Sequence, residues 1–449
     1  MGTAGRKGAR EIGLAISVGV ILADSSIVTL ALPDVLREYD ATVVGVSWVL
    51  TAFNLVLALA ILPSARAARR APRAGWAAGL AIFSLASLAC AAAPSLAILI
   101  GARIVQAGGG AMAVASAIEL LARSRGRHDL AASLWGAAGT VGVSVGPAAG
   151  GLLTELLSWR AIFEVQIPLL LLLPLVSGLR LPRPEPGTDG ALDPWPEAGL
   201  ALISAGLTAA LFLLVILLTE GWGVSPLAAA ATVSAIPLSA LGARVLAAHV
   251  GPPASAAMAG GIAIAGGLGA LAVLPGASPV LTLQPQILIG VGLAIALPVL
   301  TLAAVGGRDP RGMRAASTIA ARHAGIVAGI LILAPVLSGR LEAQQVDAQN
   351  ASTALLLDAP LPPATKIAIA TSIGEQIDAA DGRLPDVAPA FARVTPPEGS
   401  ASSYAELQSA ISEQIERAAT SAFSAPFFGA AAFALAALLP IGLLRERRS

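Results

Sequence analysis

The chain has 449 residues, of which 56% are hydrophobic and 12% charged, and its formal net charge is +1. A soluble protein carries about 25% charged residues, so this composition excludes a soluble enzyme. A helix that spans a bilayer needs about 20 mostly apolar residues, and twelve such helices would use most of the hydrophobic positions. The 28 basic residues form no long run, so we expect no nucleic-acid partner.

The predicted elements are apolar runs bounded by charged residues, glycine or proline. The first half of the chain contains six of them, at 12–33, 43–63, 75–93, 95–121, 131–153 and 161–179. A proline-rich linker at 182–195 separates them from six more, at 196–219, 225–248, 256–275, 283–305, 315–338 and 424–444. The sequence therefore predicts an all-α integral membrane protein with twelve transmembrane helices in two six-helix halves, residues 1–181 and 196–449.

The orientation follows from the basic residues, which are enriched in the cytoplasmic loops of membrane proteins. With a cytoplasmic N-terminus, 19 of the 28 fall in inside segments, which predicts an inner-membrane protein with both termini in the cytoplasm. Residues 340–423 then form an extracytoplasmic loop insert with eleven acids and five bases. Helical spacing at 363–380 and 402–422 indicates one or two amphipathic helices lying over the outer face. A solvated, partly disordered insert is the alternative.

Few ionisable residues fall inside the predicted spans, where a charge costs several kcal/mol and is therefore a functional candidate. Asp24 lies near the middle of the first span and is the strongest candidate. Arg103 lies in the fourth span, with Gln106 almost one turn later. In the eleventh span His323 follows Arg322. Histidine changes charge near neutral pH, although a single histidine is more often structural.

The fifth predicted span contains a cluster of small residues and one proline: Gly142, Gly146, Pro147, Gly150 and Gly151. Small residues four apart allow close helix contact, and an interior proline kinks a helix and frees a carbonyl group. This combination indicates a helix against which others rock. Ordinary tight packing of a glycine-rich membrane helix is the alternative.

These stretches resemble the major facilitator superfamily, and within it the drug:proton antiporters that are usually predicted with fourteen spans. The similar residues are Asp24 with Ala31-Leu32-Pro33 in the first helix, Trp48 with Thr51-Ala52-Phe53 in the second, Arg103 to Gly108 in the fourth, and Gly142 to Gly151 in the fifth. The resemblance implicates Arg103 in proton coupling, and the position of Asp24 inside the first span predicts that this carboxylate exchanges the proton. The two extra central helices of the fourteen-span group have no counterpart here.

The loop between the second and third spans resembles the cytoplasmic gating loop of the family through its basic residues, Arg66, Arg69, Arg70 and Arg73. Ala68 stands where the family has an acid, so the charge pairing that latches the two halves in the family lacks its acid here. This departure keeps open a facilitator that moves its solute without protons.

The resemblance implies a secondary active transporter that works by alternating access, without a cofactor or metal. No nucleotide-binding motif is present, so the driving force is expected from a proton gradient. Few aromatic residues favour a lipophilic or amphipathic small molecule as substrate, and Gln106, Trp48, Asn54 and His323 are candidates for its cavity. The expected partners are this substrate, protons and membrane lipids, with the protein as a monomer. A transport-incompetent membrane receptor or scaffold that acts through the outer loop is the alternative from another class.

Overall fold

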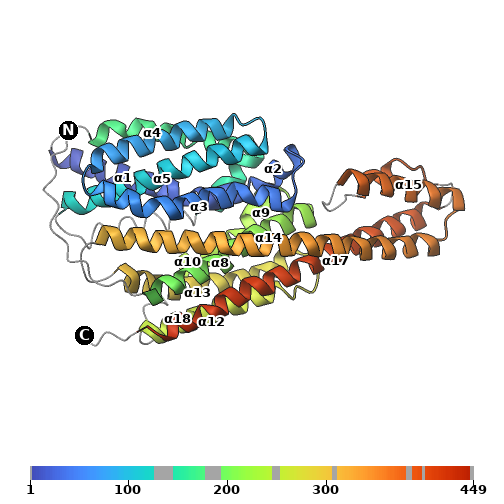
Figure 1. The fold of residues 1–449 in the computed structure, drawn as a ribbon. Helices are drawn as coiled ribbons and strands as arrows, with labels where there is room; N and C mark the ends of the chain where they lie inside the picture. Colours follow the sequence, from blue (N-terminus) through green and yellow to red (C-terminus); the bar gives the residue numbers. More distant parts are fainter. Residues whose placement is uncertain are drawn as a thin grey trace.

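The structure is a computed structural model that describes residues 3–125, 145–176, 194–244, 253–305, 311–380, 387–396 and 400–444. Within these ranges the regular secondary structure is helical throughout. Figure 1 shows long helices that lie side by side in a bundle, and α1 begins at the same end of the bundle at which α18 ends. Nine helices in the described ranges are long and apolar enough to cross a membrane. The all-helical membrane fold is confirmed, and the count of twelve spans stays a prediction.

The first part of the bundle consists of α1 (Thr3–Thr29), α2 (Leu32–Glu38), α3 (Val43–Ala68), α4 (Pro72–Ala91) and α5 (Leu96–Arg125). The starts of these helices follow local chemistry. The Thr42 side chain accepts a hydrogen bond from the Gly45 amide and caps α3. Pro72 opens α4, at a position where a missing N–H costs nothing.

Two predicted spans are interrupted by proline. In place of one helix at 161–179, the chain forms α7 (Ala161–Glu164) and the 3₁₀ helix η1 (Ile167–Val176), which contains Pro168 and Pro174. In place of one helix at 225–248, it forms α9 (Pro226–Val233) and α10 (Ala235–Gly242). Pro237 has no N–H with which to bond the Val233 carbonyl, so the helix is broken between them. The predicted span at 131–153 is described only from residue 145, and residues 145–156 are helical.

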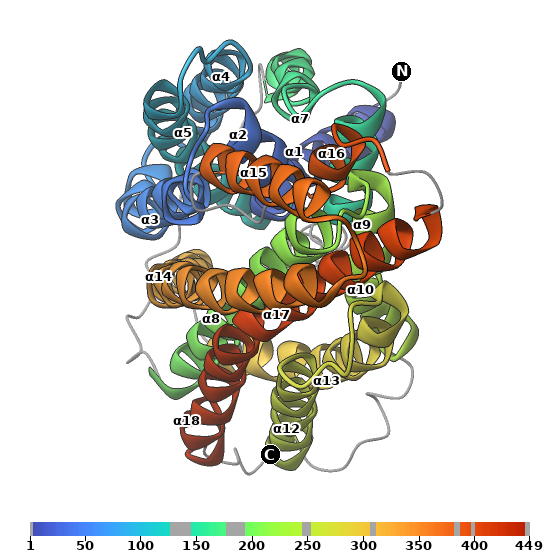
Figure 2. The ribbon, with the colours of Figure 1, turned by 90° about the vertical axis from the view of Figure 1, so that its right-hand side faces the viewer.

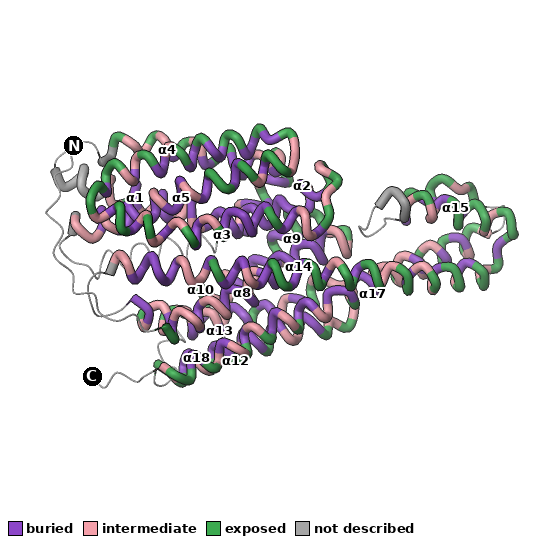
Figure 3. Tube along the Cα trace, viewed as in Figure 1, coloured by how far each residue is buried: buried purple, intermediate pink, exposed green. Residues whose placement is uncertain are grey.

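The second part contains α8 (Pro194–Ile216), the π-helical turn η2 (Leu217–Gly221), α12 (Pro253–Leu271), α13 (Pro279–Val305), α14 (Arg311–Asp358), α17 (Ala401–Ala436) and α18 (Leu438–Gly442). Helix α14 packs against α8 and also against α3 of the first part, so it joins the two parts of the bundle. Figure 3 shows buried residues on the helix faces that meet inside the bundle and exposed ones on its outside. The polar residues discussed below lie among these buried faces.

Helices α14 and α17 continue beyond the bundle and carry a helical appendage, which we define as the described residues of 340–423. It includes α15 (Pro363–Ala380) and α16 (Ala388–Ala392), and Figure 2 shows α15 in front of the ends of α1 and α2. Helix α15 coincides with the helix predicted at 363–380. The helices do not lie separately on the outer face, however, because they share an apolar core that includes Leu356, Ile369, Phe391, Tyr404 and Ile411.

Candidate functional site

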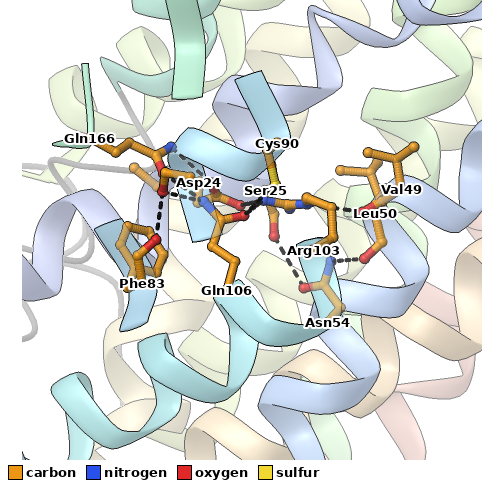
Figure 4. Close-up of polar contacts among 12 residues, drawn as sticks. Asp24, Ser25, Val49, Leu50, Asn54, Phe83, Cys90, Arg103, Gln106 and Gln166 are labelled. Carbon is orange, nitrogen blue, oxygen red and sulfur yellow. Dashed lines mark hydrogen bonds and ion pairs between the residues drawn. The ribbon is translucent and has the colours of Figure 1, made fainter. Parts of the chain in front are cut away.

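An ion pair between Asp24 of α1 and Arg103 of α5 lies inside the first part of the bundle. Arg103 Nη1 is 2.6 Å from Asp24 Oδ2, and both side chains are fully buried. Figure 4 shows the two side chains pointing toward one another. A buried ion pair is maintained only when further hydrogen bonds offset the cost of removing both charges from water.

Polar side chains from three helical segments supply those hydrogen bonds. Gln166, between α7 and η1, donates to Asp24 Oδ1 at 2.9 Å, and Arg103 Nη1 donates to Gln106 Oε1 at 2.6 Å. Gln106 Nε2 in turn donates to Gln166 Oε1 at 2.7 Å and to Ser87 Oγ at 2.8 Å. We call Asp24, Ser87, Arg103, Gln106 and Gln166 the central polar cluster. Its members connect α1, α4 and α5 to the α7–η1 segment.

Two members of the central polar cluster, Gln166 and Ser87, were not predicted as site residues. Gln166 lies in the predicted span at 161–179, where an uncharged amide stands out from its apolar neighbours less than a charge does. Serine is common in membrane helices because it allows close packing, so Ser87 carries little signal by itself. An uncharged polar residue inside an apolar run was the only sign available for Gln166.

The guanidinium group of Arg103 has further contacts with aromatic rings and backbone. Its Nε donates to the Val49 carbonyl of α3 at 3.2 Å. The Phe53 and Phe163 rings lie 4.1 and 5.7 Å from its central carbon, within the range of cation–π attraction. Nη2 has no hydrogen-bond partner among the described residues. Arg103 is therefore held on several sides and retains one donor that can bind another acceptor.

A second polar contact joins α14 to α3 and α1. His323 Nδ1 is 2.6 Å from Asn54 Oδ1, and the Ser25 hydroxyl donates to the same oxygen at 3.2 Å. All three side chains are buried. Two of the predicted cavity residues, Asn54 and His323, are therefore in direct contact, and a third, Gln106, lies in the central polar cluster.

Trp48, the fourth predicted cavity residue, is not brought to either polar group. Its side chain is 40% exposed, and the similarly spaced Leu55 and Leu59 of α3 are also exposed. Residues seven and eleven positions apart share one helix face. Trp48 therefore belongs to the apolar outer face of α3, and its placement in the cavity is not supported.

The glycine-rich segment forms close contacts on two sides. A Cβ on Gly150 would lie 2.5 Å from the Ile27 carbonyl oxygen of α1, and one on Gly146 would overlap Ser26. A Cβ on Gly151 would overlap Ala230 of α9. Pro147 is buried in the same helix, and Gly142 lies outside the described residues. This helix therefore packs between the helix that carries Asp24 and a helix of the second part.

The predicted gating loop is attached to α5 through its backbone. Arg66, Arg70 and Arg73 are exposed and Arg69 is half-buried, whereas Ala68 is buried. Arg123 of α5 donates to the Arg69 carbonyl at 2.6 Å and pairs with Glu119 at 2.6 Å. An acid on α5 therefore lies close to the loop whose own acid is replaced by Ala68.

Ion pairs also lie at the end of the bundle nearer the appendage. Arg160 donates to both carboxylate oxygens of Glu38, at 2.5 and 2.7 Å, and this hydrogen bonding lowers the pKa of Glu38. Arg37 pairs at 2.7 Å with Glu220 of the π-helical turn, which joins α2 to the second part. A surface hollow of about 480 Å³ lies beside these pairs, and burial at its edge raises the pKa of Asp34.

Several apolar helices long enough to cross a bilayer, with a carboxylate and a guanidinium paired among them, define a multi-pass integral membrane protein. The family model "Major Facilitator Superfamily" matches residues 14–339. The chain therefore belongs to this superfamily.

Curated proteins and solved structures that are similar to the chain include a multidrug resistance protein, a multidrug efflux pump and one transporter homologue. The multidrug resistance protein Stp of Mycobacterium tuberculosis is 33% identical over 165 residues, 35% of this chain and 30% of that protein. The multidrug efflux pump LfrA of Mycolicibacterium smegmatis is 33% identical over 40% of this chain and 37% of its own length. The chain thus spans about a third of the length of these relatives. A bacterial homologue of the human lysosomal transporter Spinster, in an inward-facing and unoccupied conformation, aligns over 100% of both chains with a TM-score of 0.69. At 15% sequence identity, this structural similarity shows the fold alone.

Proposed function

We propose that this transporter exports a lipophilic or amphipathic small molecule in exchange for protons by alternating access. The observation that carries the proposal is the fully buried pair of Asp24 and Arg103. A carboxylate inside a membrane protein is costly and is typically retained where charge or protons move. The similarity to a multidrug resistance protein and a multidrug efflux pump supports the substrate class.

The central polar cluster suits a carboxylate that alternates between two protonation states. In this conformation Asp24 accepts a hydrogen bond from Gln166 and forms an ion pair with Arg103. A proton that binds Asp24 removes the charge that holds Arg103, so Arg103 must find other acceptors. Nη2 of Arg103 already has an unused donor. Proton binding at Asp24 is therefore coupled to a rearrangement of α5 against α1, which is the link that an antiporter needs.

The proposed arrangement in the cell follows the distribution of basic residues. We place the end of the bundle at which α1 begins and α18 ends on the cytoplasmic side of the inner membrane. Residues 1–181 and 196–449 are the two halves, 182–195 is the cytoplasmic linker, and the helical appendage is extracytoplasmic. The two halves rock about the central region, so that the binding site opens alternately to each side of the membrane. In this scheme the monomer is the transport unit, surrounded by lipid.

Asp24→Asn tests the proposal in proteoliposomes loaded with ethidium, a lipophilic cation. We expect the wild type to move ethidium against its gradient when a pH gradient is imposed. The variant keeps the size of the side chain but cannot exchange a proton, so it should lose the driven transport and retain ethidium exchange. Glu342→Gln, which neutralises an exposed acid of the appendage, is the matched control.

Three results would contradict parts of the proposal. Unchanged pH dependence in Asp24→Asn would remove Asp24 from proton coupling. Wild-type transport that persists after the pH gradient is collapsed would favour an uncoupled facilitator, the alternative that the missing acid at Ala68 leaves open. Loss of all function after deletion of 345–420 would favour a receptor or scaffold that acts through the appendage, because basal transport does not require that segment under the present proposal.

A further inference from the structure

The oxygen of the Asn54 side chain is a meeting point of three helices. Asn54 belongs to α3, and its Oδ1 contacts His323 Nδ1 of α14 at 2.6 Å and Ser25 Oγ of α1 at 3.2 Å. Ser25 directly follows Asp24 in the chain. One amide oxygen therefore connects the helix of the proposed proton carrier with a helix from the other half of the sequence.

The geometry assigns the donor in this contact. Asn54 Nδ2 donates to the Leu50 carbonyl at 2.7 Å, which fixes the orientation of the amide. The remaining amide atom, Oδ1, can only accept hydrogen bonds. His323 must therefore carry a proton on Nδ1 and donate it to Asn54. The contact depends on this donor at Nδ1.

Helix α14 can pass a displacement of His323 on to the second half of the bundle. A Cβ at Gly325 or Gly329 would overlap the backbone carbonyls of Ala201 and Ala205 on α8. The backbones of α14 and α8 thus approach closely just after His323, so the two helices are expected to move together. A displacement of Asn54 is therefore expected to be transmitted to α8 through His323 and α14.

We propose that His323 is the positioning residue through which the protonation state of Asp24 is transmitted from α1 to α14. The inference rests on the proposed function. When Asp24 exchanges its proton and α1 shifts against α5, Ser25 moves with it and changes its bond to Asn54. The change at Ser25 determines whether the His323–Asn54 hydrogen bond is kept or lost. When this bond is lost, α14 moves relative to α3, and α8 moves with α14. His323 acts as a hydrogen-bond donor in this scheme, and the proton resides on Asp24.

The charged groups around His323 are consistent with this division of roles. Arg322 is its neighbour on α14, and Asp24, which pairs with Arg103, directly precedes Ser25 in the chain. Among the other helices packed against α14, α3 carries Arg66 in its last turn and α8 carries Glu197 in its first. Helix α5 carries Glu119, which faces Gly312 of α14 and pairs with Arg123. The ionisable residues of α17 are Glu406, Glu413, Glu416 and Arg417. Those of α17 lie in the appendage half of that helix. Asp24 is linked to His323 through the next residue, Ser25, and through Asn54.

The experiment measures the distance between the two halves without any substrate. Spin labels are placed at two exposed positions near helix C-termini, Ala67 of α3 and Leu302 of α13. Cys90 is the only cysteine, so Cys90→Ala provides a background for specific labelling, and all variants are compared within it. The distance distribution is recorded by pulsed electron resonance across about pH 5 to 8.

We expect the parent protein to shift between two distance populations with pH and Asp24→Asn to show no shift. His323→Leu removes the donor and should also lose the shift. His323→Asn places an amide N–H near the position of Nδ1 without a titratable ring, so it should restore the shift. Asn54→Leu should match His323→Leu, and the double variant should be no worse than either single one, because both remove the same bond.

The outcomes separate the two proposals. A pH shift retained in His323→Leu and lost in Asp24→Asn overturns the role of His323 and leaves the proposed function intact. Failure of His323→Asn to restore the shift means that a hydrogen-bond donor at this position is not sufficient, which also overturns the positioning role. Identical, pH-independent distances in the parent and Asp24→Asn overturn proton coupling itself, and the inference with it. If His323→Leu does not fold, as judged by size-exclusion chromatography, Asn54→Leu tests the same bond from the other side.

Discussion

Two arginine–carboxylate pairs in this protein have almost the same shortest N–O distance in opposite surroundings. Arg103 and Asp24 approach to 2.6 Å with both side chains fully buried. Arg160 and Glu38 approach to 2.5 Å, with 31% and 39% of their side chains exposed. The distance therefore does not distinguish them, whereas burial does. The comparison teaches that the energetic and functional weight of an ion pair depends on what would happen to each partner if the other were removed.

The surroundings of the two pairs reflect this difference. Water solvates the exposed carboxylate of Glu38, so this charge requires few hydrogen bonds from the protein. Trp159 Nε1 nevertheless donates one to it at 2.6 Å. The buried pair is enclosed by the central polar cluster and by two aromatic rings on Arg103. A buried charge that loses its partner has no water to replace it. Asp24 and Arg103 are thus mutually dependent in a way that Glu38 and Arg160 are not.

The largest effect is expected from Arg103→Leu, which leaves the Asp24 carboxylate buried without its partner. Removing one member of a buried pair costs about 3–5 kcal/mol. The apparent unfolding temperature in detergent, followed by size-exclusion chromatography, should fall strongly. Adding Asp24→Leu to Arg103→Leu should recover much of the loss, because no uncompensated charge remains. A single variant as stable as the wild type would mean that Asp24 carries no charge in the resting protein.

A smaller effect that depends on pH is expected from Glu38→Gln. Hydrogen bonding from Arg160 lowers the pKa of Glu38 below its ordinary value of 4.5, so the pair contributes stability at neutral pH. This contribution is lost as the pH falls from about 4.5 through the lowered pKa of the folded state. An exposed pair is worth about 0–1 kcal/mol, so the unfolding temperature at pH 7 should fall slightly.

The same measurement at acidic pH provides the control for Glu38→Gln. The variant and the wild type should converge as the pH falls, because the wild-type carboxylate becomes protonated and the pair is lost in both. A difference between them that persisted or grew at low pH would show that Glu38 acts through something other than its charge. Such a result would mean that the exposed pair cannot be compared with the buried pair as an ion pair.

The contrast between the pairs was only partly predictable from the sequence. A charge inside an apolar run is conspicuous, so Asp24 and Arg103 could be found one helix at a time. That they form a pair depends on the packing of α1 against α5, for which one sequence carries no direct signal. Gln166 and Ser87 were missed because uncharged polar residues are tolerated in membrane helices for other reasons. The exposure of Trp48 could not be predicted because its position in a motif does not say which face of α3 it occupies.

The helices were predicted better than their interruptions and extensions. Apolar runs define where a chain crosses a bilayer, and α3, α4 and α13 lie close to their predicted ranges. Pro168 and Pro237 break two predicted spans because each removes a backbone donor inside an apolar stretch. The sequence changes from apolar to amphipathic after residue 338. This change marks where the predicted membrane span ends, but α14 itself continues beyond it. Helix α14 continues because alanine, leucine and glutamine maintain helix in water as well as in lipid.

The smallest effect, and the one that completes the series, is expected from Arg417→Ala in the appendage. Arg417 pairs with Glu413 one turn earlier in α17 at 2.6 Å, the same distance as in the buried pair, with side chains 63% and 60% exposed. Pairs of this kind contribute about 0.3–0.5 kcal/mol, so the unfolding temperature should barely change, and Glu413→Gln should behave alike. The N–O distance is nearly the same in the three pairs, whereas the exposed fraction of the carboxylate side chain rises from Asp24 to Glu38 to Glu413. The loss of stability on breaking each pair should therefore fall in that order. A loss from Arg417→Ala as large as that from Glu38→Gln would show that burial is not the variable that orders these pairs.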